Sequence, residues 1–241
     1  MRAAQVQGLA TMNVFVKPNE QSQVYLSYAM ARKGRIYSNV ERHPFQPFIP
    51  DGARILMLGT FPPAAHRWCM PFYYPNFQND MWRIMGIIFF GDREHFVVEG
   101  ERRFDQPRIE AFLTEQGIAM YDTATCVVRT RNTASDKDLQ IVEETDIGAM
   151  LDRMPRCNVI VTAGMLATSV VCRRLGVDAP KVGDFATTVY KGRYVRIYRM
   201  PSSSRAYPIT AERKAALYAL AFRQACPTSS AFITTLGNPK D

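Results

Sequence analysis

Two short runs, each of strand length and each stopped by proline, constrain the fold of this chain most strongly. Residues 54–59 lead into Thr60-Phe61-Pro62-Pro63, and residues 194–200 lead into Pro201-Ser202-Ser203-Ser204. Proline can continue neither a central strand nor a helix, so both runs must end at these points. Ligands bind at the carboxyl ends of strands in open α/β sheets. The two strand ends are therefore predicted to close one pocket, although about a domain's length of chain separates them.

Between these two runs, apolar strand-like and amphipathic helix-like segments alternate. Gly117 and Gly176 follow two of the helical segments, as helix-ending glycines do. Strands separated by helices favour a mostly parallel sheet covered on both faces. The expected strands are 54–59, 118–121, 157–162, 187–190 and 194–200, and the expected helices are 79–90, 107–116, 146–154, 165–175 and 209–225.

The length of 241 residues suits one substantial domain with an extension. Residues 1–50 are expected to form a partly irregular N-terminal extension, because prolines punctuate its last part. Residues 51–226 are expected to form the α/β domain, and residues 227–241 a C-terminal tail.

The net charge of +8 is distributed unevenly. Residues 191–223 carry eight Lys and Arg residues against one Glu. A basic surface beside a pocket favours binding of a polyanionic partner. The alternative is that these charges serve only to keep the protein soluble. Without an apolar window of membrane-spanning length or a clear signal peptide, we expect no membrane contact and a cytoplasmic, nucleoid-associated location.

Five widely spaced cysteines form no CxxC pair and no Cys/His pair at metal-ligand spacing. They are expected to be reduced and mostly buried, and the sequence predicts neither a metal nor a cofactor.

The motifs resemble the uracil-DNA glycosylase superfamily, and within it the branch called hypoxanthine-DNA glycosylase-like. The matching residues are Gly59-Thr60-Phe61-Pro62-Pro63, then Tyr73-Tyr74…Asn79-Asp80-Met81-Trp82, then Pro201-Ser202-Ser203-Ser204. The resemblance covers roughly residues 53–225, and its strength lies in the order and separation of the motifs. It implies a three-layer α/β/α sandwich with a mainly parallel four-stranded central sheet. It also implies removal of a damaged base from DNA without a metal or cofactor.

Two positions depart from the better-known branches of this superfamily. Those branches have an Asp or Asn two residues after the motif glycine to position water, where this chain has Phe61. They often have a His at the start of the last motif to stabilise the departing base, where this chain has Met200. Neither side chain can polarise water or donate a hydrogen bond, so other residues must carry the chemistry if the chain is active.

The resemblance makes Asn79 the first candidate for the displaced catalytic role, since an amide can hold water or read a base edge. Asp80 is the second, as a base or as a carboxylate that stabilises positive charge on the sugar. The alternative is that either residue only caps the following helix. The expected base-binding residues are Gly59, Thr60, Phe61, Tyr73 and Tyr74, with Phe61 stacking on the base.

Ser202 and Ser203 suit phosphate or sugar contacts. Ser204, Arg205 and Tyr207 occupy the place where relatives insert a wedge into the base stack, although a plain turn is the alternative. The polar segment 122–136 follows a strand, so Arg129 and Arg131 are expected to meet phosphate near the same pocket. Asp122 and Asp136 could hold these side chains, or the four could form a salt-bridged loop without a catalytic part.

The sequence therefore predicts a monomeric, monofunctional DNA glycosylase that flips a deaminated base, uracil or hypoxanthine, and hydrolyses its N-glycosidic bond. A catalytically silent nucleic-acid-binding module is the second hypothesis. A nucleoside or nucleotide hydrolase is the third, and the basic segment 191–223 argues against it.

Overall fold

The computed structural model describes residues 28–32, 35–131 and 136–225. Its centre is a five-stranded sheet in the order β4-β3-β7-β9-β8. The strands are β3 (Ile55–Gly59), β4 (Ile118–Asp122), β7 (Val159–Ala163), β8 (Asp184–Tyr190) and β9 (Arg193–Met200). The first four in the order are parallel, and β8 is added antiparallel to β9. The mainly parallel central sheet is thus confirmed, but it has five strands and not the expected four, because β8 adds an antiparallel edge.

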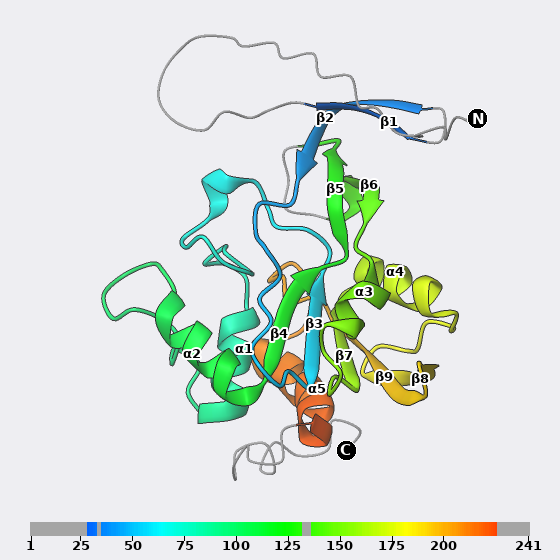
Figure 1. Ribbon diagram of the computed structural model, residues 1–241. Helices are drawn as coiled ribbons and strands as arrows, with labels where there is room; N and C mark the ends of the chain where they lie inside the picture. The colour runs from blue at the N-terminus through cyan, green and yellow to red at the C-terminus, as the bar shows by residue number, and fades with distance from the viewer. Residues whose placement is uncertain (1–27, 33–34, 132–135, 226–241) are drawn as a thin grey trace, which may run out of the picture.

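Helices flank this sheet (Figure 1). They are α1 (Met81–Phe90), α2 (Gln106–Gln116), α3 (Ile147–Asp152), α4 (Met165–Leu175) and α5 (Ala211–Ala225). Both α4 and α5 contact β7 and β9, while α1 packs beside α5 and α3 beside α4. Every residue of β3, β4 and β7 is buried. Continuous apolar strands are what a sheet covered on both faces requires, so the predicted α/β sandwich is confirmed.

Local sequence explains where these elements begin and end. Asp105 and Asp146 cap α2 and α3 by accepting from the backbone N–H of Arg108 and Ala149. Strands β8 and β9 form a hairpin whose turn residues, Lys191 and Gly192, both have positive φ. That backbone matches the twist of two antiparallel strands.

A second, antiparallel sheet in the order β1-β2-β5-β6 was not predicted. Its strands are β1 (Tyr28–Arg32), β2 (Arg35–Arg42), β5 (Ala124–Arg129) and β6 (Leu139–Glu144). Strand β5 begins almost directly after β4, and β2 pairs with β5 (Figure 1). The polar segment 122–136 therefore contains strand β5, and β6 follows it. Residues 28–32 and 35–42 of the expected extension also belong to this sheet.

The other domain boundaries stay predictions. Residues 1–27 and 33–34 of the extension, the segment 132–135 and the tail 227–241 lie outside the described residues. Within the described part of the chain, no helix is long and apolar enough to cross a membrane. Of the cysteines described there, Cys69, Cys126, Cys157 and Cys172 are all free thiols, as expected.

Candidate functional site

A pocket of about 260 Å³ lies at the carboxyl ends of the parallel strands. In the sheet register Gly59 of β3 pairs with Asp122 of β4, and Ala163 of β7 pairs with Met200 of β9. Four parallel strands therefore deliver their last residues to one edge. The lining residues come from 59–63, from Arg67, from the loop Tyr74, Pro75, Asn76, Gln78 and Asn79, from Asp122, Asp136 and Ala163, and from 202–206. The two distant strand ends thus meet at one pocket, as the sequence predicted.

Gly59 allows a close approach that no other residue would. A Cβ built at this position would overlap Oδ1 of Asp122 and lie 3.3 Å from the Tyr74 hydroxyl. The missing side chain thus lets a carboxylate and a phenol converge at the end of β3. Both Asp122 and Tyr74 line the pocket.

Thr60 and Asp136 form a second polar contact in the pocket. Oγ1 of Thr60 donates to Oδ2 of Asp136 at 2.9 Å. Burial raises the pKa of the Asp136 carboxyl, the hydrogen bond from Thr60 opposes that rise, and the charge of Asp122 adds to it. The pocket therefore holds two carboxyl groups whose charges disfavour each other.

Phe61 lines the pocket and also contacts two buried side chains. Its ring centroid is 5.3 Å from that of His43 in an edge-to-face arrangement, and the Arg129 guanidinium lies 5.9 Å from it. These contacts fix the orientation of the ring, which leaves Phe61 placed where a planar ligand could stack.

Asn79 lies directly before Asp80, the N-cap residue of α1, and lines the pocket. Its Oδ1 accepts from the backbone N–H of Met81 at 2.9 Å, and its backbone bridges to Ser204. The bond to Met81 engages the amide oxygen, which leaves the NH₂ group as the part of Asn79 that can donate to a ligand. The side chain of Asp80 makes no capping hydrogen bond to α1.

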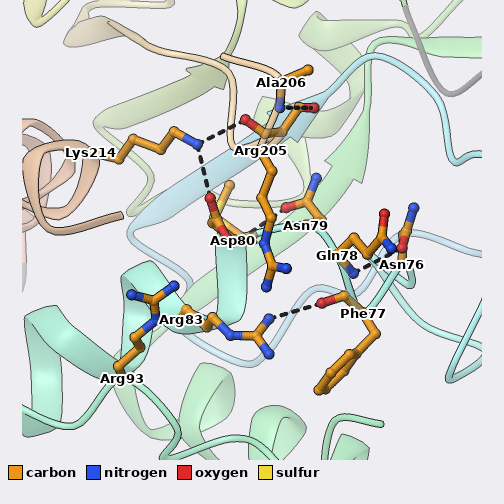
Figure 2. A network of polar contacts seen from close by, with 12 residues as sticks. Asn76, Phe77, Gln78, Asn79, Asp80, Arg83, Arg93, Arg205, Ala206 and Lys214 are labelled. Carbon is orange, nitrogen blue, oxygen red and sulfur yellow. Dashed lines mark hydrogen bonds and ion pairs between the residues drawn. The ribbon is translucent and has the colours of Figure 1, made fainter. Parts of the chain in front are cut away.

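Asp80 occupies a different environment, which Figure 2 shows. Its Oδ2 accepts from Nζ of Lys214 at 3.0 Å, and its Oδ1 from Nε of Arg205 at 3.1 Å. The Lys214 side chain is fully buried, and Lys214 also donates to the carbonyl of Ser204. Asp80 is not among the lining residues, so this geometry favours a structural ion pair that ties α1 and α5 to the last motif.

The two tyrosines of the motif point to different places. Tyr73 is buried outside the pocket lining, and its hydroxyl donates to the carbonyl of Gln46 at 2.8 Å. Tyr74 lines the pocket with a φ of 49°, and its buried hydroxyl has no hydrogen-bond partner among the described residues. Burial raises the pKa of both phenols. Of the pair, only Tyr74 is placed to wall the pocket.

The serine motif forms a turn as well as a wall. Oγ of Ser202 accepts from the N–H of Ser204, and Oγ of Ser204 accepts from the N–H of Ala206. Ser203 is buried and its carbonyl accepts from the N–H of Asp80. Ser202, Ser203, Ser204 and Arg205 line the pocket, whereas Tyr207 is not among the lining residues.

The two predicted phosphate contacts of the 122–136 segment lie elsewhere. Arg129 is bidentate to Glu41 at 2.9 and 3.0 Å and also donates to the carbonyl of Pro62. Its side chain is 8% exposed, so it holds β5, β2 and the first motif together. Arg131 is 79% exposed and lies 3.9 Å from Asp138. Neither side chain is part of the pocket lining.

His43 is the residue that sequence reasoning missed. Its Nε2 lies 2.9 Å from Oδ2 of Asp122, and its ring packs against Phe45, Phe61, Tyr73 and Tyr121. Nothing local marks it, because its partner is 79 positions away in the sequence. Only the pairing of β2 with β5 brings the two together.

Within the described residues, no group of three or more His, Cys, Asp or Glu side chains could hold a metal ion. Met200, at the position of the family's usual histidine, is fully buried in the core.

Comparison with known proteins supports the fold. No protein-family model matches the chain, and no curated protein matches it. Among solved structures, it is similar to the solution NMR structure of a "putative Uracil DNA glycosylase" from Methanosarcina acetivorans. The TM-score is 0.54 at 19% identity, over 77% of this chain and 98% of that chain. The chain therefore has a uracil-DNA-glycosylase-like α/β fold.

Proposed function

We propose that this protein is a monofunctional DNA glycosylase that removes a deaminated base, uracil or hypoxanthine, as the hypoxanthine-DNA glycosylase-like branch would. The observation that carries the proposal is the pocket at the carboxyl ends of β3, β4, β7 and β9, which joins residues of all three motifs of the resemblance. The similar fold of the archaeal structure supports it, as does the basic segment 191–223. DNA is the proposed partner of a monomeric protein in the cytoplasm.

The reaction would begin with the cationic surface holding phosphates while the target nucleotide turns out of the stack. Arg205 and Arg67, at the pocket lining, are the cations nearest to the path of the strand. The extruded base would lie against Phe61, and the NH₂ group of Asn79 would donate to a base carbonyl. Unstacking costs a few kcal/mol, which the phosphate and pocket contacts would offset.

Bond cleavage would then be heterolytic. The C1′–N bond lengthens, its electron pair stays on the base, and the sugar becomes an oxocarbenium ion. Asp122 and Asp136 line the pocket, and an ionised carboxylate there would stabilise the sugar cation through its charge. Water adds to C1′ and a proton reaches the base, so the products are a free base and an abasic site. The residues of the motifs include no lysine placed to form a Schiff base, so no strand cleavage by the enzyme is proposed.

The test is a strand-scission assay. Purified protein is incubated with oligonucleotides that contain a single uracil, hypoxanthine, xanthine or mismatched base, and abasic sites are cleaved with alkali. Scission that Asn79→Ser abolishes would support the proposal, because serine keeps an acceptor for the Met81 N–H but lacks the amide donor. Asn158→Ala is the control, since this exposed asparagine lies before β7 at the opposite edge of the sheet.

A catalytically silent nucleic-acid-binding module is the second candidate, and the apolar side chains of Phe61 and Met200 favour it. It predicts binding that weakens steeply with salt and no scission of any of these oligonucleotides.

A further inference from the structure

The pocket has a buried support that the motifs do not supply. His43, which follows β2, lies behind Asp122, and the two side chains are only 2% and 9% exposed. Nε2 of His43 is 2.9 Å from Oδ2 of Asp122. His43 is not among the lining residues, whereas Asp122 is. His43 can therefore act on a ligand through Asp122, which it contacts by a hydrogen bond, or through Phe61, against which its ring packs.

The backbone of Phe45 fixes how the His43 ring is turned. Nδ1 lies 3.0 Å from the carbonyl oxygen of Phe45 and 3.2 Å from its backbone nitrogen. An ionised carboxylate only accepts hydrogen bonds, so Nε2 is the donor to Asp122. Nδ1 accepts from the Phe45 N–H when the ring is neutral and donates to the Phe45 carbonyl when it is cationic. The ring keeps one orientation in either form, which makes it a rigid support.

The other oxygen of Asp122 faces the space that Gly59 leaves open. Oδ1 would overlap a Cβ of residue 59, and the Tyr74 hydroxyl lies 3.3 Å from the position of that Cβ. That hydroxyl is buried and has no hydrogen-bond partner among the described residues, a costly state for a polar atom. An acceptor and an unused donor therefore stand side by side at the floor of the pocket.

We propose that His43 is a positioning residue that holds Oδ2 of Asp122, so that Oδ1 accepts a ring N–H of the extruded base while Tyr74 donates to the adjacent carbonyl. This inference rests on the proposed glycosylase function. It assigns recognition of the base to Asp122 and Tyr74 in addition to Asn79. Uracil and hypoxanthine both have an N–H beside a carbonyl. Asp122 is 6% exposed, so it would meet the base in the depth of the pocket.

Two substitutions of His43 give opposite expectations. His43→Gln keeps a donor at the reach of Nε2 but loses the aromatic ring, whereas His43→Phe keeps the ring packing but loses the donor. The measurement is the affinity of each variant for a duplex with one 2′-fluoro-2′-deoxyuridine, which resists cleavage, relative to the same duplex with cytidine. We expect His43→Phe to lose about ten- to a hundred-fold of this preference, the range of a hydrogen bond to a charged group. His43→Gln should keep most of it.

A merely structural role would lower the affinity for both duplexes alike and leave their ratio unchanged. The inference is overturned if His43→Phe keeps the wild-type ratio, or if His43→Gln loses as much of it as His43→Phe. It is also overturned if wild type binds 3-methyluracil, which lacks the ring N–H, as well as uracil. Wild type that neither cleaves nor prefers uracil instead overturns the proposed function, and the inference with it.

Discussion

Asp136 lies at the pocket wall, where burial raises the pKa of its carboxyl above the ordinary value of 3.8. A group of this kind binds its proton more tightly in the folded chain than in the unfolded chain. The free energy of unfolding therefore falls as the pH rises from about 3.8 to the folded-state pKa, and the loss persists at neutral pH.

Asp136→Asn removes this titration and keeps an acceptor for the Thr60 hydroxyl. We expect the variant to be more stable than wild type near neutral pH and to lose that advantage toward about pH 4. Urea unfolding of both proteins across this pH range is the measurement. If the unfolding free energies of the two proteins changed with pH in the same way, the raised pKa of Asp136 would be contradicted.

The structure also predicts the effect of replacing Gly59 on stability and on ligand binding. In Gly59→Ala the new methyl group would overlap Oδ1 of Asp122, so the carboxylate or the strand end must move. We expect a loss of stability of about 1–3 kcal/mol, as for overpacked sites, together with loss of uracil binding. Gly100→Ala is the control, because a Cβ there meets no atom within 4 Å and the strain comes only from its φ of 75°.

The sequence located much of the pocket lining, although Tyr73, Asp80 and Tyr207 of the predicted site are not part of it. The proline stops after two strands located Thr60, Phe61 and the serines, and the motif resemblance located Tyr74 and Asn79. Their hydrogen bonds with Asp136, Met81 and one another depend on long-range geometry. Adjacent tyrosines also look alike in a sequence, although only the left-handed backbone of Tyr74 turns that ring to the pocket.

At the scale of elements, a buried ion pair joins two helices to the last motif. Lys214 of α5 binds Asp80 at the start of α1 and the carbonyl of Ser204 (Figure 2). Removing one member of a buried pair leaves the other charge uncompensated, which costs far more than loss of an exposed pair.

Lys214→Met is expected to lower the free energy of unfolding by about 3–5 kcal/mol. Arg205→Met removes the half-exposed partner of the same carboxylate and should cost no more than about 1 kcal/mol. Denaturant unfolding measures both. The double variant Asp80→Asn with Lys214→Met should recover part of the loss, and a simple sum of the two single losses would argue against the pair.

The parallel strands β3, β4 and β7 were predictable because they are short apolar runs, and β9 was predictable because Pro201 follows it. The small sheet was not, because its strands mix charged and apolar residues and bury only Val40, Cys126 and Val142 in their shared cluster. Its consequence for the site is large. Without the pairing of β2 with β5, His43 would not reach Asp122, and the pocket would lack its buried imidazole.

At the scale of the whole molecule, the fold places the pocket and its cations at one edge of the sheet. Arg67 and Arg205 both line the pocket, whereas Arg174 lies near the end of α4 and pairs with Glu144. Helix α4 begins just after β7 and runs away from the carboxyl edge, which puts Arg174 at a distance from the expected path of DNA.

A duplex that enters the pocket should therefore interact with the two arginines of the lining and not with Arg174. Each phosphate that is neutralised contributes about 0.9 to the slope of log affinity against log salt concentration. We expect the slope to fall by about one for Arg67→Gln and again for Arg205→Gln, with affinity lowered evenly for uracil-containing and undamaged duplexes. Arg174→Gln should leave both the slope and the affinity unchanged. Fluorescence anisotropy across a salt series measures these slopes, and equal effects of all three substitutions would mean that DNA approaches the protein by another face.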